Sequence, residues 1–229
     1  MPARRRWRGW CAALLGGSLL AVSSCTAVVT PPSDVVDPVT VWIGFDGGLH
    51  NNLVLPLLED AGGDVTGGLA SGAGTPEETG AAPSSTVTVI EYSYGDWDYY
   101  AAGQPGFWNG FAAIAWPTNA AFGRRRLSGA GPTRAELVDR RAPSRWRGLQ
   151  SLVVERELAL RLSTRLEARW HEGVARDTPR FNPAYDLLFV PDPRGYHAFH
   201  TCNTLLVTWL EELGCEVDGS GMFGDFVVR

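Results

Sequence analysis

Cys202 is the residue of this sequence whose position best suits a nucleophile. It follows Thr201, a residue type that caps helix N-termini, and it precedes an apolar stretch with helical spacing. The partial positive charge of a helix N-terminus stabilises a thiolate, and its backbone N–H groups can hold the oxyanion of an acyl-transfer intermediate. The position of Cys202 therefore meets two requirements of a cysteine nucleophile.

A thiol nucleophile also needs a base, and His50 is the leading candidate. It lies at the start of an expected strand, directly after the Gly-rich turn at 46–48. A third polar group must orient the imidazole. Glu91, at the end of the neighbouring expected strand, suits an antiparallel partner of His50, and Asp96 in the following turn is the alternative.

The same segment has a rival use as a metal site. His197, His200 and Cys202 are close in sequence and are ligand types suited to zinc. They supply only three ligands, and their spacing matches no strong zinc pattern, so we expect no metal and no other cofactor. Each candidate also has a structural alternative, because a buried Cys is usually inert and a His can simply brace a turn.

Cys202 and Cys215 are not expected to form a disulfide. They lie 13 residues apart, at opposite ends of one expected helix, which separates them by about 20 Å. A disulfide requires Cα atoms within about 7 Å of each other. A thiol retained in an oxidising compartment is unusual, so Cys202 needs a reason for remaining reduced.

Alternating strand patterns and spaced helical patterns predict an α+β fold, in which an antiparallel sheet packs against helices. Low content of large apolar residues favours a flexible insertion at 61–85. The expected strands are 39–45, 53–58, 86–92 and 187–190, the expected helices lie within 105–122, at 151–172 and from 202 to 213, and a short strand is expected within 218–229.

The first residues predict export and lipid anchoring. Four Arg residues, an apolar run too short to span a bilayer and two Ser residues precede Cys25, which is the layout of a cleaved signal at 1–24. The segment 22–25 resembles the lipobox of bacterial lipoproteins, whose cysteine carries the lipid. We therefore expect a lipidated tether at 25–38 and a single domain at 39–229. Thr26 is not the Asp that signals inner-membrane retention in many lipoproteins, which favours the outer membrane, with the domain facing the periplasm.

The charge of the exported chain argues against nucleic acid as a partner. All 20 basic residues are Arg. Removing residues 1–24 removes four of them and none of the 25 acidic residues, which leaves a net charge of −9. Nucleic-acid-binding proteins usually present a basic face. The expected partners are the membrane, through the lipid on Cys25, and an envelope substrate such as peptidoglycan or a lipid.

Several motifs occur in a fixed order along the chain. They are Gly48-Leu49-His50, Leu53-Val54-Leu55-Pro56, the segment 90–100 around Gly95-Asp96, Trp116-Pro117, and the segment 195–204 with Thr201-Cys202-Asn203-Thr204. Together they look like a bacterial family of uncharacterised, often lipid-anchored proteins, described as conserved hypotheticals of the urease gene region. Their order is also similar to circularly permuted papain-like thiol enzymes, including relatives of cell-wall peptidases and of lecithin–retinol acyltransferase.

The resemblance implies a Cys nucleophile, a His base and a polar orienting residue on the next strand. We therefore expect an envelope-anchored cysteine hydrolase or acyltransferase that acts on an amide or ester, with a permuted papain-like fold. Cys202 would attack, His50 would carry the proton, and Glu91 or Asp96 would orient His50. The alternative is a non-catalytic binding or scaffold lipoprotein with a papain-like core.

Overall fold

A computed structural model describes residues 26–45, 50–57, 86–103, 116–130, 138, 147–219, 221 and 224–229. The predicted signal at 1–24, Cys25 and the predicted flexible insertion at 61–85 lie outside these residues. The described elements, in chain order, are β1 (Thr26–Thr30), β2 (Pro38–Phe45), β3 (Asn51–Pro56), β4 (Thr86–Asp96), the π-helical turn η2 (Trp97–Ala101), β5 (Thr118–Ala130), β6 (Gly148–Glu155), α4 (Arg156–Arg176), β7 (Arg180–Asn182), β8 (Leu187–Tyr196), α5 (Cys202–Glu212), β9 (Glu216–Asp218) and β10 (Asp225–Val228).

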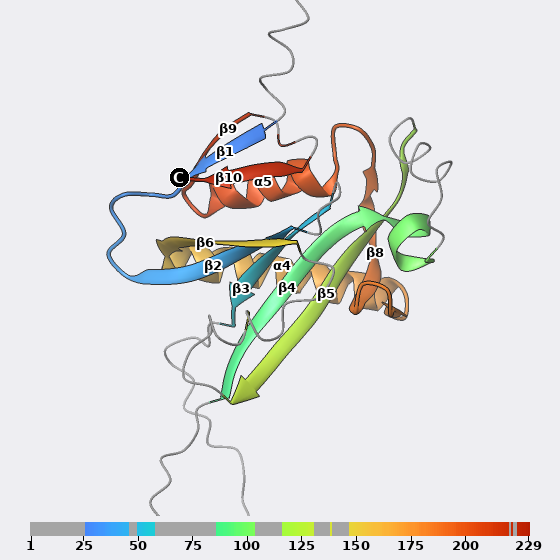
Figure 1. The fold of residues 1–229 in the computed structure, drawn as a ribbon. Coiled ribbons are helices and arrows are strands. Elements are labelled where there is room, and N and C mark those ends of the chain that lie inside the picture. Colours follow the sequence, from blue (N-terminus) through green and yellow to red (C-terminus); the bar gives the residue numbers. More distant parts are fainter. Residues whose placement is uncertain are drawn as a thin grey trace, which may run out of the picture.

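The described strands form two sheets. The larger sheet has seven strands in the order β6-β2-β3-β4-β5-β8-β7, and every neighbouring pair is antiparallel. The smaller sheet has the order β10-β1-β9, in which β1 runs parallel to β10 and antiparallel to β9. In Figure 1, α5 lies between the two sheets. The mixed α+β class predicted from the sequence is therefore confirmed.

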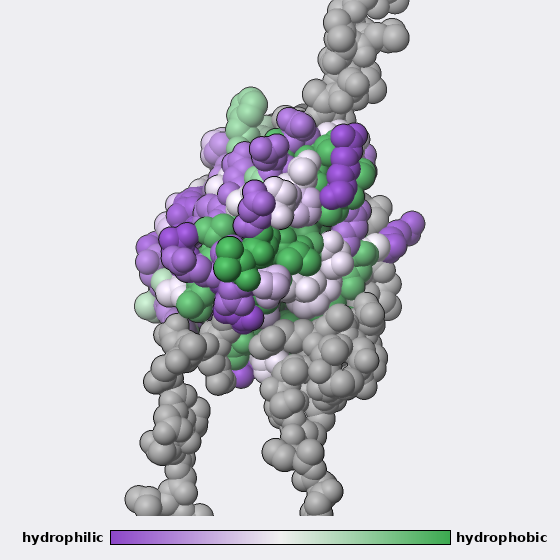
Figure 2. Space-filling model, turned by 90° about the vertical axis from the view of Figure 1, so that its left-hand side faces the viewer, coloured by the Kyte–Doolittle hydropathy of each residue, from purple (hydrophilic) through white to green (hydrophobic). Residues whose placement is uncertain are grey.

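The predicted tether at 25–38 is wrong for residues 26–30, because these residues form β1, the central strand of the smaller sheet. Ala27 and Val29 are fully buried there. The connection 31–37 leads on to β2 at the left of Figure 1. Figure 2 shows that side of the molecule, where apolar side chains gather among polar ones. Val36 in this connection is 91% exposed.

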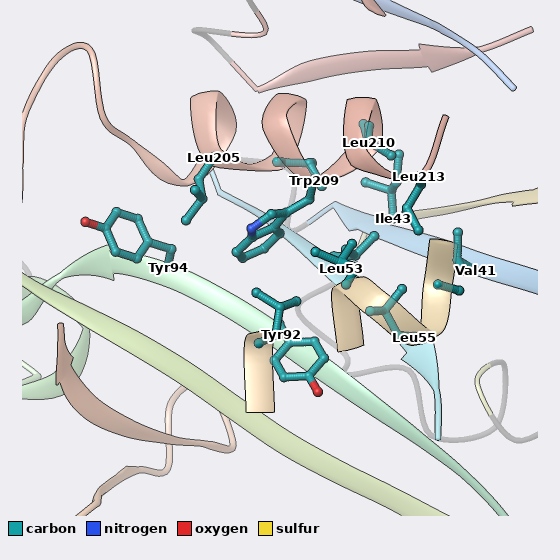
Figure 3. Close-up of a cluster of buried hydrophobic side chains, with 14 of the residues drawn as sticks. Val41, Ile43, Leu53, Leu55, Tyr92, Tyr94, Leu205, Trp209, Leu210 and Leu213 are labelled. Atoms are coloured by element: carbon teal, nitrogen blue, oxygen red, sulfur yellow. The ribbon is translucent and has the colours of Figure 1, made fainter. Parts of the chain in front are cut away.

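The main core lies between one face of the larger sheet and the two helices. Strand alternation directs Val41, Ile43, Leu53, Leu55 and Tyr92 toward α5 and α4 (Figure 3). On α5, the apolar residues expected from the sequence meet them, and all are buried: Leu205, Leu206, Trp209, Leu210 and Leu213. The smaller sheet contributes Ala27, Val29 and Phe226 to the same core.

The opposite face of the larger sheet buries polar residues as well as apolar ones. Alternate residues of β3 and β4 face this side, and His50, Asn52, Glu91 and Ser93 are all nearly or fully buried. Apolar residues of the same face, including Trp42, Val54 and Val89, form a separate cluster. Buried polar side chains carry a desolvation cost unless they are hydrogen-bonded, so this face depends on paired contacts.

The predicted helix at 151–172 begins too early, because residues 148–155 form β6 and α4 begins at Arg156. Leu152 and Val154 are buried while Ser151 and Val153 are exposed, which is the two-residue alternation of a strand. The expectation of helix within 105–122 is wrong from Thr118, where β5 begins, and residues 105–115 lie outside the described part. The predicted strands 39–45, 86–92 and 187–190 and the helix from Cys202 are confirmed.

Candidate functional site

Cys202 is the first residue of α5, and Thr201 is its N-cap, as predicted. A capping box fixes this end of the helix. The Thr204 backbone N–H donates to Thr201 Oγ1 at 3.3 Å, and the Thr201 backbone N–H donates to Thr204 Oγ1 at 2.8 Å. The side chain of Cys202 is held at a defined helix N-terminus and is only 3% exposed.

Two polar side chains contact the Cys202 sulfur. Its thiol donates to Asn203 Oδ1 at 3.6 Å, and the Tyr196 hydroxyl forms a hydrogen bond with it. Burial, followed by the charge of the Cys202 thiolate and the hydrogen bond to it, raises the pKa of Tyr196 above its ordinary value. The Tyr196 hydroxyl therefore keeps its proton at neutral pH, where it can donate a hydrogen bond to the sulfur.

Asn203 connects the start of α5 to the larger sheet. Asn51 Nδ2 donates to Asn203 Oδ1 at 2.8 Å and to the backbone carbonyl of Gly224 at 2.9 Å. Asn51 and Asn203 are both at least 97% buried. These bonds join β3, α5 and the residue before β10 next to the thiol, so the position of Cys202 is tied to three elements distant in sequence.

Tyr94 and His200 form the next part of the site. The Tyr94 hydroxyl and the Gly195 carbonyl each lie 3.2 Å from His200 Nδ1. Burial, followed by the positive charges of His197, Arg169 and Arg194, lowers the pKa of His200 below its ordinary value of 6.5. The imidazole of His200 is therefore predominantly neutral at pH 7, which is the form that can accept a proton.

His50 has a different set of neighbours. Its Nε2 lies 2.8 Å from Ser93 Oγ, and its ring stacks on Tyr100 with a centroid distance of 4.4 Å. Asn51 faces α5, so strand alternation directs His50 to the opposite face of the sheet. Neither of these contacts involves Cys202, and the Cys202–His50 pair stays a prediction.

Glu91 and Asp96, the two predicted orienting acids, both form hydrogen bonds with neighbouring elements of the fold. Glu91 lies opposite Val54 in the β3–β4 pairing, so the expectation that it is the cross-strand partner of His50 is wrong. Its carboxylate accepts from Asn52 Nδ2 at 2.8 Å and forms an ion pair with Arg125.

Asp96 ends β4 and caps the π-helical turn that follows. Its carboxylate accepts from the Tyr99 backbone N–H at 2.8 Å and from Thr118 Oγ1 at 2.5 Å. A carboxylate that accepts these two hydrogen bonds stabilises the turn. The role of Asp96 as an orienting residue for His50 stays a prediction.

Sequence reasoning missed the residues that contact the thiol. Tyr196 and Asn203 lie within the quoted motifs, and Asn51, which binds Asn203, lies between two of them. Their residue types did not distinguish a role at or near the sulfur from a role in packing. The useful signal was composition: an Asn at the second position of an apolar helix and two consecutive Asn residues at the start of a buried strand are costly unless they are hydrogen-bonded.

The two described cysteines both carry thiols, as predicted. Burial raises the pKa of Cys215 to about 11. Among the described residues, His197, His200 and Cys202 included, no three or more His, Cys, Asp and Glu side chains lie close enough together to hold a metal ion. None of the described helices combines the length and apolarity needed to cross a membrane.

Comparisons with known proteins add no identification. The chain matches no family model, no curated protein and no solved structure.

Proposed function

We propose that this protein is an envelope-anchored lipoprotein with a cysteine-dependent hydrolase or acyltransferase activity toward an amide or ester. The observation that carries the proposal is the Cys202 thiol at the N-terminus of α5, hydrogen-bonded to Tyr196 and Asn203. A helix N-terminus and a neutral hydroxyl both stabilise a thiolate, and a fixed Asn holds the first helical turn in place. We propose the permuted papain-like arrangement on the same basis, with sheet strands preceding the nucleophile helix.

The chemistry is covalent catalysis in two steps. The Cys202 thiol gives its proton to a base, and the sulfur forms a bond to the substrate carbonyl carbon, whose electron pair moves to oxygen. That pair returns, the bond to the alcohol or amine breaks, and the leaving group takes the proton. Water, or a second alcohol or amine, then attacks the thioester and restores the thiol. The Cys202 backbone N–H stabilises the oxyanion in both steps.

Two histidines are candidates for the base. His50 is the residue implied by the family resemblance, and its ring contacts Ser93 and Tyr100. His200 precedes Cys202 by two residues and is neutral at pH 7 because its pKa is lowered. Because catalytic hydrogen bonds often tighten only when substrate binds, both remain candidates. Glu91 and Asp96 are the proposed orienting acids if His50 is the base.

Alkylation of the thiols across pH tests the proposal, and Cys215 is the internal control. Iodoacetamide labelling is followed separately at Cys202 and Cys215 by mass spectrometry of peptides. An ordinary thiol has a pKa of about 8.5 and reacts as the thiolate, so it is alkylated slowly below about pH 8. We expect Cys202 to react well below pH 8, and Cys215 to react only as the pH approaches its pKa of about 11.

Histidine variants then identify the base. His50→Gln or His200→Gln should slow Cys202 labelling at low pH, and the variant that does so identifies the base. His171→Gln is the matched control, because His171 lies on the exposed face of α4. A Cys202 with the pH profile of an ordinary thiol, unchanged in both variants, would instead support the alternative of a non-catalytic binding or scaffold lipoprotein.

Metabolic labelling with a fatty acid tests the anchor. We expect label on the wild-type protein and none on Cys25→Ala, with the Cys202→Ala variant labelled like the wild type. Label that persists in Cys25→Ala after neutral hydroxylamine, which removes any acyl thioester on Cys202, would exclude Cys25 as the lipid site. Peptidoglycan peptides and lipid esters are the proposed substrate classes, and the outer membrane facing the periplasm is the proposed location.

A further inference from the structure

The start of β1 and the candidate thiol lie at the same end of the domain. Thr26 pairs with Asp225 at the start of β10. The carbonyl of Gly224, the preceding residue, accepts from Asn51, which also binds Asn203 beside Cys202. In Figure 1, the start of β1 and the connection from β8 to α5 both lie at the upper side of the molecule.

Two highly exposed aromatic side chains occupy this same end. Phe199, in the connection from β8 to α5, is 81% exposed, and Trp116, just before β5, is 73% exposed. Thr118 of β5 pairs with Tyr196 of β8, so Trp116 and Phe199 lie at the same end of the β5–β8 ribbon. Exposing two large aromatic side chains to water is unfavourable, and aromatic residues favour the membrane–water interface.

A lipid on Cys25 would be attached directly beside β1, with no tether between the lipid and the strand. The predicted lipid-bearing Cys25 is one residue from Thr26, which limits their Cα separation to about 4 Å. Ala27 and Val29 are fully buried in the smaller sheet, so β1 is a fixed part of the domain. A lipid on Cys25 therefore brings this particular end of the domain against the bilayer.

We propose that this end of the domain docks on the bilayer surface through Phe199 and Trp116, and that the substrate is an acyl ester of a membrane lipid. Cys202 is three residues from Phe199, which limits the separation of their Cα atoms to about 10 Å, and docking at Phe199 would bring the bilayer surface, where lipid esters are found, within that distance of Cys202. The thiol attacks the ester carbonyl, the lipid alcohol leaves with the thiol proton, and water or a second alcohol or amine releases the acyl group. The docking rests on lipidation of Cys25, and the choice of substrate rests on the proposed thiol activity.

Bromolipid quenching tests the docking. The lipidated full-length protein is reconstituted into phosphatidylethanolamine and phosphatidylglycerol vesicles, with and without brominated acyl chains. Phe199→Trp adds an indole at the proposed membrane contact, and Val36→Trp adds one at a similarly exposed position in the connection 31–37. Emission is compared with that of wild type, because native Trp residues, including Trp116, are present in both variants. We expect the emission added by the indole at 199 to be quenched in brominated vesicles and the emission added by the one at 36 to persist. Equal behaviour of the two indoles, or failure of the protein to float with vesicles, overturns the docking.

A labelled acyl chain on the phospholipid tests the substrate class. We expect hydroxylamine-sensitive label on wild type and on Val36→Asp, and loss of that label in Phe199→Asp and in Cys202→Ser. Quenching at 199 without transfer of label overturns the lipid substrate while the docking stands. If Cys202 is alkylated rapidly at low pH but no acyl label is transferred, the lipid substrate is overturned while the proposed thiol activity stands.

Discussion

Asn51 of β3 donates a hydrogen bond to Oδ1 of Asn203 on α5 over 2.8 Å, beside the Cys202 thiol. The two residues are separated by 152 positions in the chain, and both are buried. The bond therefore fixes the start of α5 on the sheet, and it links the stability of the domain to the position of the sulfur.

Removal of the Asn203 side chain should destabilise the domain. Asn203→Ala deletes the acceptor of the Asn51 bond and is expected to lower the free energy of unfolding by about 1–3 kcal/mol, the cost of a lost buried hydrogen bond. Urea unfolding measures the effect. Thr208→Ala, at an exposed position of the same helix, is the comparison variant, with an expected change of about 0.5 kcal/mol or less. Unfolding of Asn203→Ala at the wild-type urea concentration would contradict the role assigned to this bond.

Trp209 should be among the most sensitive positions of α5. It is 1% exposed and meets the ring of Phe122 edge-on, with a centroid distance of 6.4 Å. Trp209→Ala is expected to cost about 3–5 kcal/mol, because it loses apolar burial and leaves a cavity. Thr208→Ala, at the neighbouring exposed position, should change stability by about 0.5 kcal/mol or less. Thermal or urea unfolding of both variants measures the difference, and similar losses would contradict the packing of α5.

The Glu91–Arg125 ion pair should contribute far more to the stability of the fold than an exposed ion pair does. Glu91 is fully buried, and Arg125 is 10% exposed. Arg125→Met leaves the Glu91 carboxylate buried without this cation, and we expect a loss of about 3–5 kcal/mol. Arg156→Met breaks the exposed contact with Asp37 and should cost about 1 kcal/mol or less. Equal effects on the urea midpoint would exclude the buried pair as a major determinant of this face.

An element could be predicted where its apolar residues recur at regular spacing over several turns and its ends carry capping residues close by in the sequence. The spacing of Leu205, Trp209 and Leu213 continues over three helical turns and is bounded by Thr201 and Gly214, so α5 could be placed to within one residue. β1 could not be recognised, because its five residues resemble a linker, and the partners that bury Ala27 lie about 190–200 residues further along the chain.

Prediction of the site met a similar limit. The helix N-terminus placed Cys202 from local sequence alone, whereas the neighbours of His50 depend on strand register and on which face each residue takes. A shift by one residue exchanges the two faces of a strand, so local sequence alone does not decide which of two consecutive residues faces α5. Asn51, the residue after His50, is the one whose side chain contacts α5.

His200 should make stability depend on pH. Its pKa in the folded protein lies below the ordinary value of 6.5, because it is partly buried and close to His197, Arg169 and Arg194. The unfolded chain therefore binds a proton more readily than the folded protein does. The contribution of His200 is fully present above about pH 6.5 and is lost as the pH falls from there through the lower folded pKa. We expect the urea midpoint to decline over this window in wild type and to decline less in His200→Gln. His171→Gln, at an exposed position of α4, should keep the wild-type profile. A steeper decline in His200→Gln, or an identical profile, would show that His200 does not carry this dependence.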